Sequence, residues 1–462
     1  MFKLRPYQLD IIQQARQLIK NGVRSILIQS PTGSGKTCLT AHMMGTSSQK
    51  GIPSWFVVHR RELLYQSSTT FDDVGIPYGI IAAGFPANSK PLVQIASVQS
   101  LARRINKVKS PKLIVWDECH HLAAKSYSKI HANYPDAIHI GLTATPQRLD
   151  GKGLGGWFTH MVHGPSPAIL IEQGYLSPYR AYAPMTIDAT GLHERMGDFI
   201  SKEVEAIVDK PTITGDAIKH YLRYAQGKRA IVFCASIKHS NHVAEQFNLS
   251  GIPAEHVDGE TDRRIRDAAM GRFNAGKALI ICNVDLFGEG LDVVALEAVI
   301  LLRHTQSLSL SLQQVGRALR PAEGKTAIIL DHVGNLQRHG LPDDDREWSL
   351  AGRDIRKSGD KENSIPVRTC PKCFAVLKAA VTVCQYCQHV FEITPREVIE
   401  KEGELVEVDK ELLRRGRMRE QGRVNGFEEL VALGKKRGYK SPHAWARFIV
   451  QARQAKQARR QG

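Results

Sequence analysis

Short apolar runs alternate with helix-length segments up to about residue 335, and this alternation constrains the fold more than any other feature. Each run has the length of a β-strand. Strands separated by helices form a parallel sheet with helices on its faces, so the pattern predicts an α/β fold. The runs are SILIQS (25–30), SWFVVH (54–59), PLVQIAS (91–97), KLIVWD (112–117), AIHIGLT (137–143), RAIVFCAS (229–236), ALIICNVD (278–285), LEAVILLR (296–303) and TAIILD (326–331).

The alternation pauses across residues 150–180, which are rich in Gly and Pro. We therefore expect two tandem α/β lobes joined by a hinge near 165–178, because Gly and Pro interrupt regular elements. The expected segments are a first lobe at 1–165, a second lobe at 166–345, a linker at 346–367, a four-cysteine segment at 368–392 and a charged, mainly helical tail at 393–462.

Neither a membrane span nor an export signal is evident in the sequence. No run of 18 apolar residues exists, and the N-terminus lacks the apolar stretch of a signal peptide. We therefore expect a cytoplasmic protein, in which cysteines stay free or bind metal. Four of the eight cysteines are expected to be small buried side chains: Cys38, Cys119, Cys234 and Cys282.

The stretch SPTGSGKT (30–37) lies between a predicted strand and a predicted helix. It fits the phosphate-binding pattern G-x-x-x-x-G-K-[ST] except for the first Gly, where Gln29–Ser30 stand. In such a loop Lys36 can reach the β- and γ-phosphates of ATP, and Thr37 can hold Mg²⁺. The predicted ATP contacts here are Pro31, Thr32, Gly33, Ser34, Gly35, Lys36 and Thr37.

The polar stretch VWDECHH (115–121) ends another apolar run. Ligands of open α/β sheets bind at such strand ends, so Asp117 is placed to hold Mg²⁺ and Glu118 to activate the attacking water. A zinc site is the alternative, but consecutive residues of an extended strand point to opposite faces and cannot converge on one ion. We expect Cys119 and His120 to lie on the adjoining turn.

Together with LTATPQR (142–148), these two motifs resemble those of the superfamily 2 helicases. That resemblance implies two RecA-like lobes with ATP bound between them. It also implies that LRPYQ (4–8) reads adenine through Gln8 and Arg5, and that HRRELLYQ (59–66) contacts a nucleic-acid strand through Arg61. The stretch IASVQSL (95–101) resembles a further phosphate-contacting motif.

In the second lobe, SLQQVGRALRP (311–321) contains Gln313, Arg317 and Arg320 in the pattern Q-x-x-G-R-x-x-R. On a helix, Arg317 and Arg320 would share a face and present two cations to the phosphoryl group in transfer. The stretch LFGEGLDV (286–293) resembles the preceding helicase motif, which implies that Gly290 and Asp292 line the nucleotide cleft.

Four cysteines follow in the pattern C-x₂-C-x₁₀-C-x₂-C: Cys370, Cys373, Cys384 and Cys387. Each C-x₂-C turn can supply two corners of a tetrahedral Zn²⁺ site, and the spacing suits a zinc ribbon. A dithiol or disulfide pair is the alternative reading. No open ligand position is implied, so the site is expected to be structural.

The net charge of +17 is unevenly distributed. Residues 410–462 contain 15 Lys and Arg against 4 Asp and Glu, and Tyr439, Trp445 and Phe448 are interspersed with the cations of 434–453. Such a mixture can neutralise phosphates and stack on bases, or the aromatics can form the core of a helical cap. Helicase lobes, a zinc segment and a basic tail in this order resemble the bacterial RadD (YejH-type) helicases and their phage relatives.

The resulting hypothesis is an ATP-dependent DNA helicase or translocase acting in repair, recombination or replication, with ATP, Mg²⁺ and Zn²⁺ as ligands. DNA, single-stranded or branched, is the expected partner, with repair or recombination proteins beside it and no membrane. Three alternatives remain open: an RNA helicase, a restriction-type DNA motor subunit, and an ATP-gated DNA clamp that does not unwind.

Overall fold

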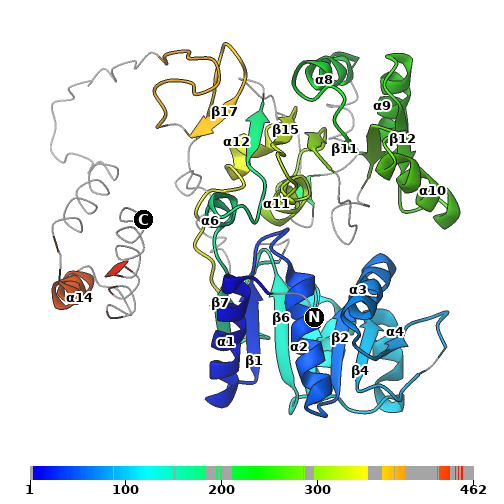
Figure 1. The fold of residues 1–462 in the computed structure, drawn as a ribbon, viewed down its shortest axis with the longest axis vertical. Helices are drawn as coiled ribbons and strands as arrows, with labels where there is room; N and C mark the ends of the chain where they lie inside the picture. Colours follow the sequence, from blue (N-terminus) through cyan, green and yellow to red (C-terminus); the bar gives the residue numbers. More distant parts are fainter. Residues whose placement is uncertain are drawn as a thin grey trace. The chain divides into compact units, whose positions relative to one another are not determined.

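Two parallel β-sheets, one in each lobe, form the framework of the chain (Figure 1). The computed structural model describes residues 4–86, 88–148, 152–183, 194–195, 198–199, 211–284, 286, 296–351, 367–378, 380–391, 424, 426–436, 443, 446, 449 and 450. The predicted α/β class with two lobes is confirmed, and each of the nine predicted runs contains a strand. No helix in the described ranges is long and apolar enough to cross a membrane.

The lobe 1 sheet has seven strands in the order β3-β4-β2-β5-β6-β1-β7. Its strands are β1 (Ser25–Gln29), β2 (Ser54–Val58), β3 (Tyr78–Ile81), β4 (Val93–Ser97), β5 (Leu113–Trp116), β6 (Ile138–Thr143) and β7 (His160–His163). Its helices are α1 (Pro6–Lys20), α2 (Lys36–Gln49), α3 (Arg61–Val74), α4 (Val98–Arg104) and α5 (Lys125–Asn133), with short 3₁₀ turns at Ile105–Lys107 and Cys119–Ala123.

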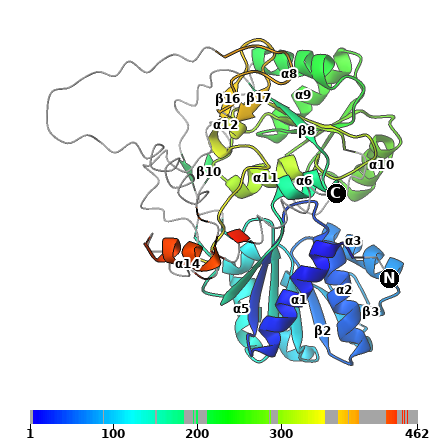
Figure 2. The same ribbon diagram turned by 60° about the vertical axis from the view of Figure 1, so that its left-hand side comes forward.

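Helices cover both faces of the lobe 1 sheet, which explains why its central strands are apolar throughout. Ile26 and Ile28 of β1 pack with α1, α2 and α3 on one face. Leu27 of the same strand packs with α4 and α5 on the other face. Figure 2 shows α1 and α5 on either side of the sheet. The alternation along β1 therefore builds two cores from one strand.

The lobe 2 sheet has six strands in the order β12-β13-β11-β14-β15-β8. Its strands are β8 (Tyr179–Tyr182), β11 (Ala230–Phe233), β12 (Ala254–Val257), β13 (Ile280–Asn283), β14 (Ala298–Leu301) and β15 (Ala327–Asp331). Its helices are α6 (Pro167–Glu172), α8 (Pro211–Tyr224), α9 (Ile237–Leu249), α10 (Arg263–Asn274), α11 (Leu308–Gly316) and α12 (Asn335–His339). Two short paired strands, β9 (Glu194–Arg195) and β10 (Asp198–Phe199), form a separate ribbon.

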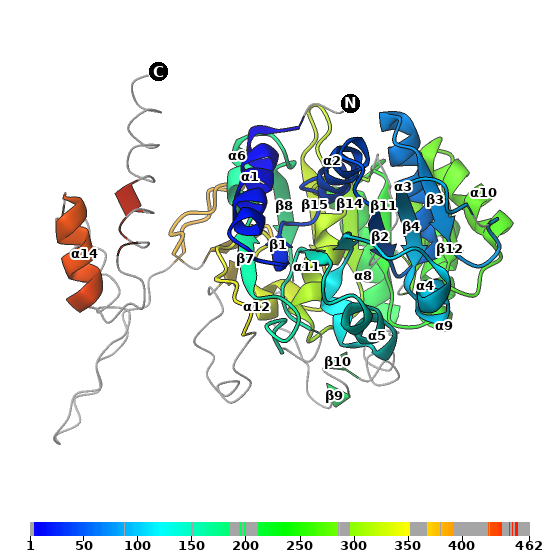
Figure 3. The ribbon, with the colours of Figure 1, turned by 90° about the horizontal axis from the view of Figure 1, so that it is seen from below.

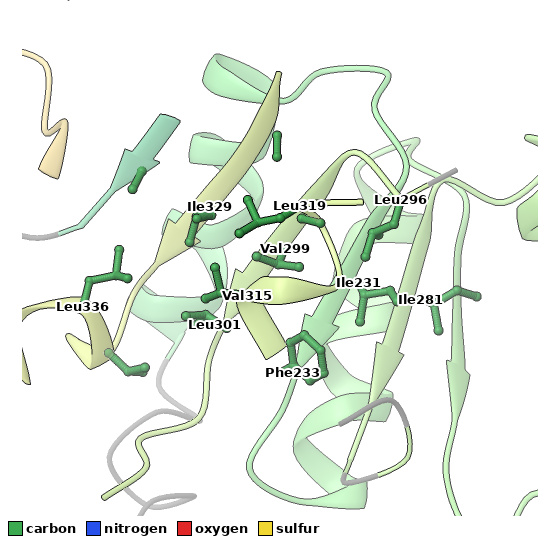
Figure 4. Packing of buried hydrophobic residues seen from close by; sticks show 14 of the residues in the cluster. Ile231, Phe233, Ile281, Leu296, Val299, Leu301, Val315, Leu319, Ile329 and Leu336 are labelled. Carbon is green, nitrogen blue, oxygen red and sulfur yellow. The ribbon is translucent and has the colours of Figure 1, made fainter. Parts of the chain in front are cut away.

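Helix α11 is fixed to the lobe 2 sheet by apolar packing. Val315 and, just beyond the helix, Leu319 are buried against Ile231, Val299 and Leu301 of the sheet (Figure 4). This packing positions the polar residues of α11 and of the turn that follows it.

A small antiparallel hairpin carries the four-cysteine segment, with strands β16 (Val367–Thr369) and β17 (Val376–Lys378). The hairpin lies against β8 of lobe 2, where Tyr182 and Ala375 form an antiparallel bridge. The chain divides into one compact unit at Met1–Ile393 and a second at Thr394–Gly462. In the second unit, α14 (Phe427–Lys436) contributes to a small apolar cluster with Ala446.

Candidate nucleotide site and cysteine cluster

The predicted phosphate-binding loop connects β1 to α2. Gly33 and Gly35 have φ angles of 84° and 82°, in the left-handed region that favours glycine. Ser34 Oγ donates to the Pro31 carbonyl at 2.6 Å and lies 2.7 Å from Ser30 Oγ, which fixes the loop from within. The Lys36 ammonium lies over the loop, 3.3 Å from the Ser30 carbonyl oxygen. Thr37 follows in the first turn of α2.

The first turn of α1 holds this loop in place. Gln8 is buried, and its Nε2 donates to the carbonyl oxygens of Ser34 and Gly35 at 3.1 and 3.3 Å. The Tyr7 hydroxyl also donates to the Ser34 carbonyl. The guanidinium carbon of Arg5 lies 4.6 Å from the ring centre of Tyr175, on the segment that leads into lobe 2. The sequence predicts adenine contacts for Gln8 and Arg5. It did not predict the contacts that Tyr7 and Tyr175 make here.

Asp117 and Glu118 follow directly after β5. Asp117 interacts electrostatically with Lys36 of the phosphate-binding loop. Burial raises the pKa of Asp117 to about 7 and the Glu118 charge adds to that rise, whereas the electrostatic influence of Lys36 and His59 opposes it. A divalent cation would favour the ionised form in the same way as Lys36. The Asp117 carboxylate therefore suits Mg²⁺ as a ligand.

Glu118 has a left-handed backbone, with φ 43° and ψ 54°. The chain turns there into the 3₁₀ turn Cys119–Ala123, as expected for Cys119 and His120. In the described ranges, the groups of three or more His, Cys, Asp or Glu placed to share one ion do not include this stretch.

A chain of polar contacts runs from Glu118 to lobe 2. The Nδ1 atom of His120 lies 3.3 Å from Glu118 Oε2 and 3.2 Å from Thr143 Oγ1. Thr143 Oγ1 accepts a hydrogen bond from the backbone N–H of Thr145 at 3.2 Å. The hydroxyl of Thr145 in turn contacts the hydroxyl of Ser309 on α11. Ser309 was not predicted from the sequence.

The prediction that Arg317 and Arg320 share a helix face is wrong, because α11 ends at Gly316. The chain continues through a turn in which Ala318 N–H donates to the Val315 carbonyl at 3.0 Å. Pro321 follows Arg320 and disfavours helix in the residue before it. Gln313 and Arg317 are buried, and burial lowers the pKa of Arg320 to about 10.

The turn after α11 nevertheless meets the phosphate-binding loop. A Cβ atom at Gly316 would lie 2.6 Å from the Cβ of Thr32, and one at Gly33 would lie 3.8 Å from Cγ of Arg320. The structure therefore brings Thr32, Gly33 and Arg320 together across the two lobes, and only glycine fits at position 316. Gly290 and Asp292 lie outside the described residues.

The four cysteines of the C-terminal hairpin converge on one point. All four Sγ atoms lie within 4.8 Å of one another, with Cys370–Cys387 and Cys373–Cys384 each at 3.6 Å. Tetrahedral Zn–S bonds of about 2.3 Å require S–S distances of about 3.8 Å. The sulfurs therefore fit Zn²⁺, and the four thiols occupy every corner.

Each pair of cysteines is held by the same backbone turn. Phe374 N–H donates to the Cys370 carbonyl at 2.8 Å, and Gln388 N–H donates to the Cys384 carbonyl at 2.9 Å. Phe374 and Gln388 both have a positive φ, of 59° and 57°. The two halves of the segment thus form a matched pair of turns around the candidate metal position.

Two protein-family models match parts of this chain. Residues 1–148 match the family "Type III restriction enzyme, res subunit", and residues 214–322 match "Helicase conserved C-terminal domain". A 51.5 kDa protein of a Lactococcus phage (isolate 7-9) is 35% identical over 83% of this chain and 82% of its own length.

The "Putative ATP-dependent helicase IRC3" of Saccharomyces cerevisiae is 27% identical over 72% of this chain, and the match spans only 51% of that relative. Among solved structures, a fragment of a putative HsdR subunit of a type I restriction enzyme from Vibrio vulnificus matches with a TM-score of 0.59. That match has 23% identity and covers 73% of this chain and 66% of the other, so it supports the fold.

Proposed function

We propose that this chain, which belongs to the superfamily 2 helicases, is a DNA-stimulated ATPase that moves along DNA or remodels it. Members of this family hydrolyse ATP, so the chain is an enzyme that uses ATP and Mg²⁺. The observation that carries the proposal is the contact between the phosphate-binding loop and the turn after α11. It supports an ATP site shared by the two lobes, whose closure follows nucleotide binding.

The polar residues of the proposed ATP site have distinct roles in binding and hydrolysis. Lys36 binds the β- and γ-phosphates, Thr37 and Asp117 hold Mg²⁺, and Glu118 orients the attacking water and accepts its proton. Bound Mg²⁺ neutralises charge on the transferred phosphoryl group. Arg317 and Arg320, with Gln313 beside them, stabilise that charge from lobe 2. The adenine contacts of Gln8 and Arg5 and the cleft contacts of Gly290 and Asp292 complete the proposed site.

The cysteine cluster is proposed to bind one structural Zn²⁺. This proposal rests on the four converging sulfurs. Four thiols fill all the positions of a tetrahedral zinc site, as in structural zinc sites. Zinc binding requires reduced thiols, so we also propose that the protein works in a reducing compartment, the cytoplasm. The role in DNA repair, recombination or replication rests on the resemblance to RadD alone.

A restriction-type DNA motor is the second candidate function. The match of residues 1–148 to the res subunit family and the fold of the HsdR fragment favour it. No nuclease motif is evident in the sequence, so a motor of this kind would act with a partner subunit.

ATPase rates with different nucleic acids test the proposal. We expect single-stranded or forked DNA to stimulate hydrolysis strongly, RNA to stimulate it weakly, and Lys36→Ala to abolish it with every cofactor. Stimulation by unbranched duplex DNA alone would favour the restriction-type motor. Stimulation by RNA alone, or by no nucleic acid, would overturn the proposal.

A further inference from the structure

A groove lies beside β3, the strand at one edge of the lobe 1 sheet. Figure 3 shows the position of this edge strand next to β4. The loop between β3 and β4 forms one wall of the groove. Buried Gln94 donates to the carbonyl oxygens of Asn88 and Pro91 at 3.1 and 2.8 Å. A Cβ atom at Gly79 would lie 2.0 Å from the Asn88 oxygen, so glycine lets the loop pack directly on β3. These contacts give the groove a defined shape.

The groove has an apolar floor and a basic rim. The apolar lining, here called the floor, includes Trp55, Ile81, Phe85 and Val108. The basic lining, here called the rim, consists of Lys90, Arg104, Lys107 and Lys109. No Asp or Glu is among the described lining residues. The cavity volume is about 390 Å³, within the range of roughly 300–1,000 Å³ that is usual for ligand sites. One nucleotide unit therefore fits in it.

Most of the rim cations come from one short, strongly basic segment of the chain. RRINKVKSPK (103–112), which links α4 to β5, contains five cations and no carboxylate. Within the described part of the chain, no ion pair is recorded for the side chains of the four rim residues. Cations gathered without counter-charges create a potential that attracts anions. The groove therefore suits an anionic ligand that also has apolar parts.

Phe85 connects this groove to the predicted strand-contacting motif. Its ring centre lies 5.5 Å from that of Tyr65 on α3, and the guanidinium carbon of Arg61 lies 5.4 Å from the Phe85 ring. A Cβ atom at Gly84 would lie 3.2 Å from Nη2 of Arg61, so the loop itself rests on that side chain. Arg61 and the groove thus form one continuous surface on lobe 1.

We propose that the groove at the β3 edge binds a single-stranded segment of nucleic acid that continues from Arg61, with bases on the apolar floor and phosphates on the basic rim. This combination of apolar and cationic groups is the one that binds unpaired strands. A duplex does not offer its bases to the floor. An acidic peptide would match the rim, but the continuity with Arg61 through Phe85 favours the strand. The proposal rests on the proposed function and extends the strand contact predicted at Arg61.

A length series of oligothymidylates tests the groove in the full chain. The test variant replaces Lys90, Lys107 and Lys109 with Ala, and the matched control replaces the exposed Lys20, Lys238 and Lys277 with Ala. Each phosphate contact on a single strand contributes about 0.7 to the slope of log K against log salt. For long oligonucleotides we expect the test variant's slope to be about 2 units shallower than that of the wild type. A fourfold rise in salt then weakens wild-type binding roughly 20-fold more than binding by the test variant.

The shortest bound oligonucleotides should bind equally to all three proteins, because they reach only the predicted contact at Arg61 and not the groove. Equal slopes and equal length dependence for the test and control variants would overturn the groove proposal while leaving the proposed function intact. Binding of a labelled poly-glutamate peptide that is lost in the test variant, with unchanged DNA length dependence, would replace it with a peptide site. A wild-type protein that binds no oligonucleotide at any length would overturn the proposed function and the groove together.

Discussion

At the residue scale, Glu118 stands out because a non-glycine residue occupies the left-handed region at the end of β5. Such a conformation costs about 1–3 kcal/mol and persists where the surroundings enforce it. Here it turns the chain sharply, so that Asp117 follows the strand while the Glu118 carboxylate meets His120. Two adjacent carboxylates thereby acquire different surroundings, which suits two different roles.

Replacing Glu118 with Gln is expected to preserve ATP binding and to slow hydrolysis about 10²–10⁴-fold, the usual contribution of a general base. Lys36, Thr37 and Asp117 remain in the variant. Equilibrium binding of labelled ATP and steady-state ATPase rates measure the two effects separately. Lys36→Ala is the comparison, since it should lose binding as well. Near-normal turnover by the Gln variant would contradict the role given to Glu118.

His139 of β6 is a second residue whose surroundings define its protonation. Its Nδ1 accepts a hydrogen bond from Trp116 Nε1–H at 3.1 Å, and its Nε2 lies 2.9 Å from the Tyr134 carbonyl oxygen. This pattern requires a neutral ring with the proton on Nε2. Burial lowers the pKa of His139 to about 4, with the nearby His131 as a further cause.

The lowered pKa predicts a loss of stability on acidification. Between the unfolded-state pKa of about 6.5 and the folded-state pKa of about 4, the unfolded chain binds the extra proton, so stability falls as the pH falls. The contribution of His139 is complete above pH 6.5 and amounts to at most about 3 kcal/mol. Urea unfolding at pH 7 and pH 5 should show a smaller pH effect for His139→Gln than for the wild type. An equal pH effect in the two proteins would contradict this assignment.

At the element scale, the four-cysteine hairpin is an extension of lobe 2. Ala183 N–H donates to the Phe374 carbonyl at 3.1 Å, and the Tyr224 hydroxyl donates to the Cys373 carbonyl at 3.2 Å. Val376 of β17 belongs to the apolar core of lobe 2. The cysteine turns therefore contact the sheet at its β8 edge, and loss of the metal should be felt there.

Removal of zinc is expected to expose residues 367–391 and to weaken hydrogen-exchange protection at β8, while β1 to β6 of lobe 1 stay protected. Zinc supplies about 10–16 kcal/mol of apparent binding energy in small domains, so the hairpin should not fold without it. Chelator treatment with hydrogen exchange by mass spectrometry measures this, and elemental analysis checks for one Zn²⁺ per chain. Cys38→Ser is the control for an isolated thiol. Unchanged protection of β8 without metal would show that the hairpin is energetically independent.

At the scale of the whole molecule, much of the net positive charge lies in the C-terminal part of the chain. Residues 410–462 have a net charge of +11, from 15 basic and 4 acidic residues, and lie within the second compact unit. Leu430, Val431 and Ala446 are buried there, with Phe427 and Ile449 packed against them, so part of the tail has its own apolar core. The predicted aromatic stretch with Tyr439, Trp445 and Phe448 lies outside the described residues.

Truncation after Asp409 is expected to weaken DNA binding and to flatten its salt dependence by several units, at about 0.9 per phosphate contact on duplex and 0.7 on single strands. Basal ATPase activity should survive, because the proposed nucleotide contacts end at Arg320. Fluorescence anisotropy at several salt concentrations compares the full and truncated chains. Identical slopes would mean that the tail solubilises the protein or binds another partner.

The sequence alone determined the class of fold and the central strands, and most residues of the proposed site were first predicted from it. Central strands are covered on both faces, so their apolar runs are continuous and visible. Within the two large sheets, the strands without a predicted run are β3, β7, β8 and β12, which are the edge strands of those sheets. An edge strand packs on fewer sides and keeps half-exposed polar residues, as in HMVH of β7 and AEHV of β12, which weakens the signal.

Only the tertiary structure decided how these parts meet. The end of α11 at Gly316, the contact of that residue with Thr32 and the hydroxyl contact between Thr145 and Ser309 join residues far apart in the chain. The same holds for the groove at the β3 edge, which combines cations of 90–109 with apolar side chains that include Trp55 of β2 and Ile81 of β3. Local propensity specifies elements, whereas tertiary packing sets which of their ends come into contact.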